Sequence, residues 1–254
     1  MRSLKEKLKQ LSSRSDEISV TISMPTHRTH PDNKQDEVKL KNLVNQAVNN
    51  LEDRFGKREA GRVIEILETT AGEIDHNYNL DSLHLFISEN TASVVRLPFP
   101  VENGEVIINN RFDVHYIEKA LEKSREYLLL LLSQGGVQLF DVMNDNIIEE
   151  IRTDGLPMSE NRHYITHGDK ASDPKQVDNQ VRAYFNQVDK AVVEVHRETG
   201  LPVVVTSTPR NYEHLLSVAD KPSMYIGNSR INYNDVKPDT LGKNAWDLLT
   251  DQSD

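Results

Sequence analysis

The first 125 residues show strand-like and helix-like hydrophobic patterns in turn. Residues 17–25, EISVTISMP, alternate and are rich in β-branched side chains, which predicts a strand ending at Pro25. Two amphipathic helices should follow, because apolar residues recur at intervals of three and four. Their apolar stripes consist of Leu40, Leu43, Val44, Ala47, Val48 and Leu51, and of Ala60, Val63, Ile64, Leu67, Ala71 and Ile74. The remaining pattern predicts a hairpin over residues 80–99, an extended piece over 105–112 and a helix over 113–127.

From Tyr127 onward the apolar runs become continuous. Residues 127–142, YLLLLLSQGGVQLFDV, predict two strands joined by a tight turn at Gly135 and Gly136, where glycine supplies positive φ angles. A long helix should begin at Pro174, since Asp173 can cap it. Its apolar stripe consists of Val177, Val181, Tyr184, Phe185, Val188, Val192 and Val195. The last expected elements are strands over 147–151, 202–207 and 223–228 and helices over 210–219 and 238–254.

The order of these elements predicts an α/β protein. Strands and helices alternate after residue 126, which indicates a mixed or parallel sheet covered by helices. A length of 254 residues is comfortable for two domains. We therefore expect two α+β domains, over residues 1–125 and 126–254, the second containing a mixed sheet with covering helices.

Composition narrows the classes of function. The absence of cysteine excludes disulfides, thiolate catalysis and cysteine zinc sites. The longest apolar run, residues 128–132, is far shorter than the ~20 residues that cross a bilayer, and the charged N-terminus has no apolar signal core. We expect a cytoplasmic protein with no membrane partner. The net charge of −10 argues against general RNA or DNA binding but leaves room for a local basic patch.

A first polar loop, residues 24–32, carries His27, Arg28 and His30 just before a predicted helix. An arginine beside a helix N-terminus can hold an anion, because unpaired N–H groups and the macrodipole favour negative charge. The two histidines lack the usual helical zinc spacing and a clear third ligand, so we expect no metal. An anion or RNA contact and an ordinary structural loop both remain open.

A second polar loop, residues 156–172, contains His163 and His167. No glutamate follows His163, so the zinc-protease motif is absent. Either histidine could act as a general base, but no nucleophile is identified beside them. His167, Gly168 and Lys170 precede the long helix, where a phosphate-rich ligand could approach its N-terminus, although a solvated loop is the alternative. We predict no catalytic residue, no metal site and no cofactor.

Several segments together resemble the bacterial archaeo-eukaryotic release factor family. They are SVTISMPTHR, KLKNLVNQAVNNL, YLLLLLSQGGVQLFDV and QVRAYFNQVDKAVVEVHRETGLPVVVTS, in this order. The resemblance implies that the second domain is similar to the ribonuclease-H-like middle domain of archaeal and eukaryotic release factors and of Pelota. In release factors a Gly-Gly-Gln loop of that domain helps water cleave peptidyl-tRNA. The corresponding interval here, residues 156–173, has no such tripeptide, and Gly135-Gly136 is followed by Val137.

The resemblance leads to a functional expectation. We expect a protein that binds the ribosome or tRNA in translation rescue, termination or hibernation, without hydrolysing peptidyl-tRNA. The predicted RNA contacts are His27, Arg28, His163, His167, Gly168 and Lys170. One alternative is a hydrolase of peptidyl-tRNA or a related nucleotide-linked ester, with His163 or His167 as general base. Another is a non-catalytic scaffold for protein partners, which the acidic net charge favours.

Overall fold

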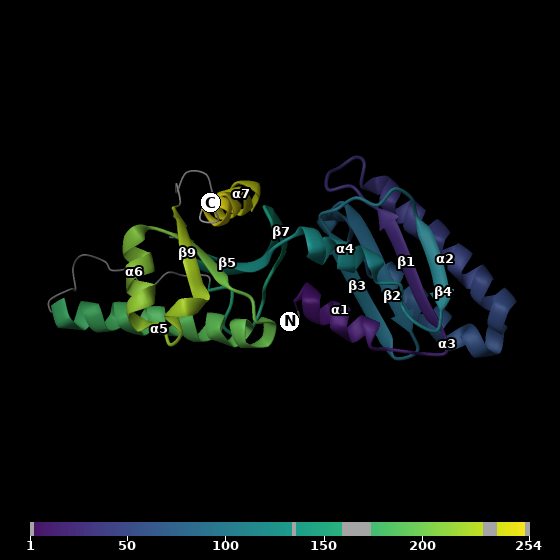
Figure 1. Ribbon diagram of the computed structural model, residues 1–254, viewed down its shortest axis with the longest axis horizontal. Coiled ribbons are helices and arrows are strands. Elements are labelled where there is room, and N and C mark those ends of the chain that lie inside the picture. The colour runs from purple at the N-terminus through teal and green to yellow at the C-terminus, as the bar shows by residue number, and fades with distance from the viewer. Residues whose placement is uncertain (1–2, 134–135, 159–173, 231–237, 252–254) are drawn as a thin grey trace. The chain divides into compact units, whose positions relative to one another are not determined.

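A computed structural model describes residues 3–133, 136–158, 174–230 and 238–251. Within them the chain forms two compact units, one over Leu4–Lys123 and one from Ser124 onward (Figure 1). We call these the N-terminal unit and the C-terminal unit. Each contains its own sheet and covering helices. The predicted mixed α/β class is therefore confirmed.

The N-terminal unit contains an antiparallel sheet of four strands in the order β3-β2-β1-β4. The strands are β1 (Ser19–Pro25), β2 (Ser82–Ser88), β3 (Thr91–Leu97) and β4 (Glu105–Asn109). The helices are α1 (Leu4–Ser12), α2 (Lys34–Phe55), α3 (Lys57–Gly72) and α4 (His115–Lys123), with a 3₁₀ turn η1 (His76–Tyr78). Figure 1 shows α2 and α3 on one face of the sheet and α1 and α4 on the other.

The two faces of this sheet differ in chemistry. Val20, Ile22 and Met24 of β1 are buried in the core that contains the predicted stripes of α2 and α3. The alternate residues Thr21 and Ser23 point to the opposite face, because side chains alternate along a strand. They are also buried, at 2% exposure each. The polar face of this sheet is therefore shielded from solvent.

The C-terminal unit contains a mixed sheet of five strands in the order β7-β6-β5-β8-β9. The strands are β5 (Glu126–Ser133), β6 (Gly136–Met143), β7 (Asn146–Glu150), β8 (Val203–Ser207) and β9 (Tyr225–Arg230). Strands β7, β6 and β5 pair antiparallel, whereas β5, β8 and β9 pair parallel. The helices are α5 (Pro174–Thr199), α6 (Pro209–Val218) and α7 (Pro238–Asp251), with a 3₁₀ turn η2 (Pro222–Met224).

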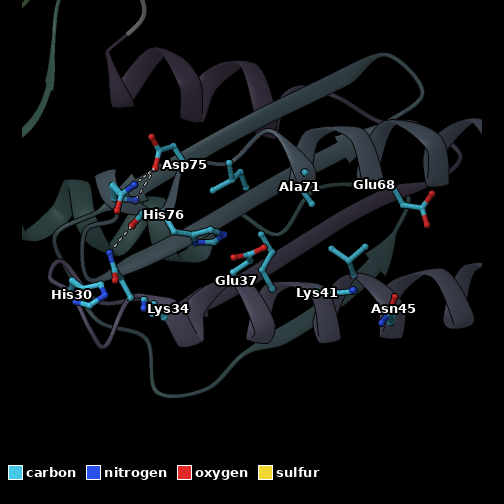
Figure 2. A pocket seen from close by; sticks show the side chains of 15 residues that line it. His30, Lys34, Glu37, Lys41, Asn45, Glu68, Ala71, Asp75 and His76 are labelled. Atoms are coloured by element: carbon cyan, nitrogen blue, oxygen red, sulfur yellow. Dashed lines mark hydrogen bonds between the residues drawn. The ribbon is translucent and has the colours of Figure 1, made fainter.

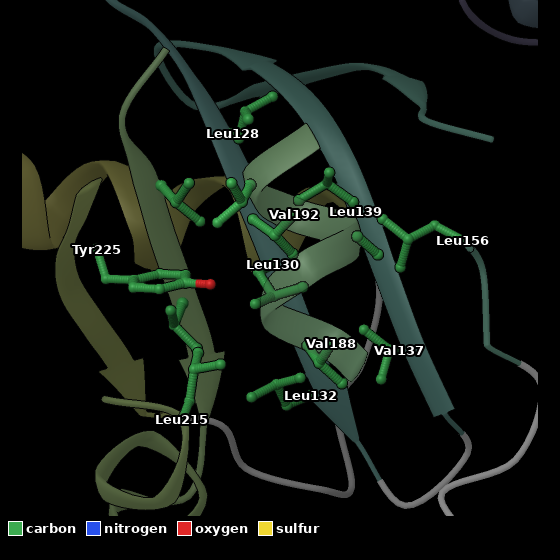
Figure 3. Close-up of a cluster of buried hydrophobic side chains, with 14 of the residues drawn as sticks. Leu128, Leu130, Leu132, Val137, Leu139, Leu156, Val188, Val192, Leu215 and Tyr225 are labelled. Carbon is green, nitrogen blue, oxygen red and sulfur yellow. The ribbon is translucent and has the colours of Figure 1, made fainter. Parts of the chain in front are cut away.

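Both faces of the mixed sheet are apolar. Leu128, Leu130 and Leu132 of β5 pack with the stripe of α5, as Figure 3 shows for part of this core. Leu129 and Leu131 belong to a second cluster that includes residues of α7. A strand buried on both faces needs an unbroken apolar run. This explains why residues 128–132 are all leucine.

Two local expectations are corrected. Gly136, which was expected in a turn with Gly135, instead pairs with Ser133 and begins β6, with φ +128°, whereas Gly135 lies outside the described residues. The helix expected over residues 113–127 ends at Lys123, since the following residues enter β5.

Candidate functional site

The loop between β1 and α2 carries His27, Arg28 and His30 and is held against the N-terminal unit. Its first residue, Thr26, donates from Oγ1 to the Leu80 carbonyl oxygen at 2.8 Å. The backbone N–H of Thr26 donates to the carbonyl oxygen of Asp81 at 3.0 Å. Both acceptors belong to the segment that leads into β2. The start of the loop is therefore positioned by residues that are remote in sequence.

A fully buried carboxylate, Asp36, organises this loop. It accepts hydrogen bonds from the backbone N–H of His27 at 2.8 Å and from Asn79 Nδ2 at 3.1 Å. The His27 ring places Nδ1 2.9 Å from the other carboxylate oxygen. A buried carboxylate is stable only when its oxygens are paired in this way. Asp36 thus joins the loop, the first turn of α2 and the segment after η1.

Arg28 forms a bidentate ion pair with Asp81. Its Nε and Nη2 atoms each lie 2.7 Å from one carboxylate oxygen. The side chains are 39% and 31% exposed, so solvent weakens the pair. This geometry leaves Arg28 at the surface with its charge balanced by Asp81.

The N–H groups at the start of α2 are used within the loop. The amides of Lys34, Gln35 and Asp36 donate to the carbonyl oxygens three residues earlier, at 3.1–3.2 Å. These three amides are therefore not free to hold an anion, contrary to the prediction of an anion site at the helix N-terminus. The predicted RNA contact of His27 and Arg28 stays a prediction that depends on their side chains.

A groove lies beside this loop, between α2 and α3 (Figure 2). Its volume is about 590 Å³. Apolar side chains of Leu40, Val44, Ala71 and Ile74 form part of its lining. The polar lining residues include His30, Lys34, Glu37, Lys41, Glu68 and His76. Neither His76 nor Glu37 was selected from sequence, because no motif distinguishes them from other surface residues.

Sequence reasoning also missed His84, which is fully buried in β2. Its Nε2 lies 2.9 Å from Ser82 Oγ and its Nδ1 lies 3.0 Å from Ser23 Oγ. Burial, with a smaller effect of His115, lowers the pKa of His84 from 6.5 to about 3. His84 is therefore neutral at physiological pH. The alternation of β2 places it on the same face as Ser82, and this was the only available signal.

Most of the second predicted loop, residues 156–172, lies outside the described residues. His163, His167, Gly168 and Lys170 lie outside the described residues. On the near side, Met158 exchanges two backbone hydrogen bonds with Val137, at 2.9 and 3.0 Å. Met158, the last described residue before the loop histidines, therefore lies beside the start of β6.

The start of β6 lies at the same end of the sheet as the carboxyl ends of β5, β8 and β9, because β6 pairs antiparallel with β5 and the other three strands are parallel. Ser207 donates from its N and Oγ atoms to Asn228 Oδ1, both at 3.1 Å. Thr206 Oγ1 and Ser229 Oγ lie 2.6 Å apart. Polar side chains thus gather at the carboxyl ends of β8 and β9.

The described ranges contain neither a metal-binding cluster nor a membrane-spanning helix. Among those residues, no group of three or more histidine, aspartate or glutamate side chains could hold a metal ion. No helix in the same ranges is long and apolar enough to cross a membrane.

Comparison with known proteins identifies the family. The model of Bacterial archaeo-eukaryotic release factor family 3 matches residues 126–254, which is half of the chain. The chain belongs to this family. The resemblance noted from the sequence is therefore confirmed, and the C-terminal unit is the part that carries the match.

This release factor family member is also similar to solved structures. An archaeal translation termination factor, aRF1, aligns with 98% of this chain and 74% of its own, at 12% identity and a TM-score of 0.36. A structure described as an archaeal protein aligns with 98% of this chain and 75% of its own, at 12% identity and a TM-score of 0.34. No curated protein matches the chain.

Family membership supports a release-factor-like role in translation. The sequence of this family member contains no Gly-Gly-Gln tripeptide. The corresponding interval has His167, Gly168 and Asp169.

Proposed function

We propose that this protein binds the ribosome or tRNA in translation rescue, termination or hibernation, and that it does so in the cytoplasm without hydrolysing peptidyl-tRNA. The match of residues 126–254 to the release factor family carries the proposal. Absence of the Gly-Gly-Gln tripeptide supports the non-hydrolytic part. An acidic residue such as Asp169 would bring negative charge to an RNA-lined site, where it would be repelled by phosphate.

The arrangement of the C-terminal unit supports a contact through residues 156–173. Met158 of this interval pairs with Val137 at the start of β6, at the same end of the sheet as the ends of β8 and β9. In open α/β sheets, ligands bind outside the carboxyl ends of the strands. His163, His167, Gly168 and Lys170 are the contacts that we propose within the interval.

The N-terminal unit would add His27 and Arg28. An exposed ion pair contributes only about 0–1 kcal/mol, so a phosphate could replace Asp81 beside Arg28 at small cost. Arginine suits this exchange because its planar guanidinium binds carboxylate and phosphate with the same bidentate geometry. His27 lies next to it and remains partly exposed, at 42% for its side chain.

Ribosome co-sedimentation tests the proposal. The 254-residue chain should pellet with ribosomes at low salt and less at moderate salt, because phosphate contacts release counterions. The double variant His167→Ala, Lys170→Ala and the single variant Arg28→Ala should each pellet less than the wild type. Lys57→Ala is the matched control, since this lysine lies outside the proposed contacts and pairs with Glu52. A protein that stays in the supernatant at low salt would contradict ribosome binding and favour a protein scaffold.

Hydrolysis needs a separate assay. Purified protein incubated with peptidyl-tRNA on ribosomes should release no peptide above the uncatalysed rate, whereas a release factor with Gly-Gly-Gln provides the positive control. Release that disappears in the double variant His163→Ala, His167→Ala would instead establish a hydrolase that uses a loop histidine.

A further inference from the structure

The groove between α2 and α3 has the dimensions and lining of a small-molecule site. Its volume of about 590 Å³ falls within the range of roughly 300–1,000 Å³ that is typical of ligand pockets. Leu40 and Val44 from α2 face Ala71 and Ile74 from the end of α3 and the residues after it. These side chains supply an apolar surface on which a flat group can pack.

His76 presents a defined hydrogen-bonding group to this groove. Asn79 Nδ2 donates both to the buried Asp36 carboxylate, at 3.1 Å, and to His76 Nδ1, at 3.2 Å. Because Nδ1 accepts this bond, the proton of the neutral ring lies on Nε2. Figure 2 shows the His76 ring reaching between the two helices. The hydrogen bond from Asn79 therefore fixes the orientation of the His76 ring, which offers the Nε2–H donor and an aromatic surface to a ligand.

Charged side chains of both signs complete the lining. Lys34, Glu37 and Lys41 follow one another at intervals of three and four along α2, and Glu68 contributes from α3. Within the described part of the chain, the side chains of these four residues form no hydrogen bond or ion pair. They are available to a ligand that carries both hydrogen-bond donors and an anionic group.

We propose that this groove binds a single nucleotide. The base would pack on the apolar surface beside His76, because histidine rings stack on unpaired bases. A carboxylate of Glu37 or Glu68 would accept from ribose hydroxyls, as acidic residues do in dinucleotide sites. Lys34 and Lys41 would contact the phosphate. The mixture of charges disfavours a simple anion, and the polar lining disfavours a purely apolar ligand.

This site goes beyond the proposed ribosome contact, since it lies in the N-terminal unit and requires no ribosome. The same chemistry could belong to a free nucleoside monophosphate or to an unstacked nucleotide at the end of an RNA strand. Binding to purified protein therefore tests the groove separately from co-sedimentation, and failure of either experiment leaves the other interpretable.

Isothermal titration of the 254-residue chain provides the first test. AMP, GMP, CMP and UMP are the probes, with adenosine and inorganic phosphate as comparisons. At least one monophosphate should bind saturably with one site per chain. Adenosine should bind about tenfold more weakly than AMP if AMP is that ligand, because contacts to a charged group are lost. Equal binding of phosphate alone, or no saturable binding of any monophosphate, would overturn the proposal.

Variants then locate the site. His76→Ala and the double variant Lys34→Ala, Lys41→Ala should each weaken binding by about tenfold or more. Ala71→Phe should abolish binding by filling the groove, and its circular dichroism spectrum would verify that it folds. Lys39→Ala is the matched control, because Lys39 lies on α2 but does not line the groove. Nucleotide affinity that is unchanged in His76→Ala and in the double lysine variant would place the ligand elsewhere and reject this site.

A final comparison identifies the source of the nucleotide. A tetranucleotide RNA should compete with the bound monophosphate if the groove accepts the end of a strand. Equal or tighter binding of the tetranucleotide would assign the site to RNA. Tighter binding of the monophosphate would assign it to a free nucleotide. A tetranucleotide whose binding is unaffected by both the monophosphate and Ala71→Phe binds at a different surface, and the assignment to RNA would then be wrong.

Discussion

At the scale of single residues, the N-terminal unit depends on buried polar side chains whose partners are distant in sequence. Asp36 contacts Asn79 across 43 positions, and His84 contacts Ser23 across 61. A sequence pattern can identify Arg28 and His27 as loop residues but cannot reveal which carboxylates they meet. The loop position was thus predictable, whereas its ion pairs and the groove beside it were not.

Replacing Asp36 should lower the free energy of unfolding far more than replacing Asp81. Asp36→Ala leaves the partly buried donors of His27 and the buried amide of Asn79 without an acceptor, which should lower the free energy of unfolding by about 2–4 kcal/mol. Asp81→Ala removes only an exposed partner and should cost less than about 1 kcal/mol. Urea denaturation followed by circular dichroism measures both. Equal losses in the two variants would contradict the structural importance of Asp36.

His84 should make stability depend on pH. Its pKa of about 3 in the folded state lies below the 6.5 of an unperturbed histidine. The unfolded chain therefore binds more protons between these values, so the free energy of unfolding falls as pH decreases from about 6.5 toward 3. The slope due to this residue should approach about 1.4 kcal/mol per pH unit.

Urea denaturation at pH 7.5, 6.0 and 5.0 measures this slope. His84→Gln should show a smaller loss between pH 6.0 and 5.0 than the wild type, while His30→Gln, at an exposed position, should keep the wild-type loss. If His84→Gln retains the full wild-type slope, proton uptake at His84 is not its cause.

At the scale of elements, the helices and strands follow the hydrophobic pattern closely. The apolar stripe of α2 was sufficient to predict that helix, because a single face of it packs on the core. The leucine run of β5 was sufficient to predict that strand, because the strand is buried on both faces. The covered polar face of β1 was not predictable, because alternation with serine and threonine normally indicates solvent. The position of Gly136 in β6 reflects strand register, which the pairing of whole strands determines.

Two glycines within helices should respond oppositely to alanine. A Cβ at Gly242 of α7 would lie 2.2 Å from the backbone oxygen of Asp145, so Gly242→Ala should destabilise the protein by about 1–3 kcal/mol. Gly61 of α3 has no atom within 4 Å of that position, and Gly61→Ala should stabilise by up to about 1 kcal/mol. Thermal denaturation should show shifts of opposite sign. A stabilising Gly242→Ala would mean that α7 does not pack closely on the turn before β7.

At the scale of the whole molecule, each unit has a separate hydrophobic core. We therefore propose that residues 4–123 and 124–254 are independent domains, close to the boundary expected from sequence. Each fragment expressed alone should show a cooperative thermal transition, because its own core is sufficient for folding. Circular dichroism of both fragments would test this. A fragment without a transition, despite solubility, would show that its stability requires the other half.

The hydrogen bonds of Asp36 have a consequence for communication within the N-terminal unit. One carboxylate holds the backbone of His27 and, through Asn79, the ring of His76. If a ligand in the groove changes the affinity of Arg28 for an anion, thermodynamic reciprocity requires the anion to change the affinity of the groove by the same factor.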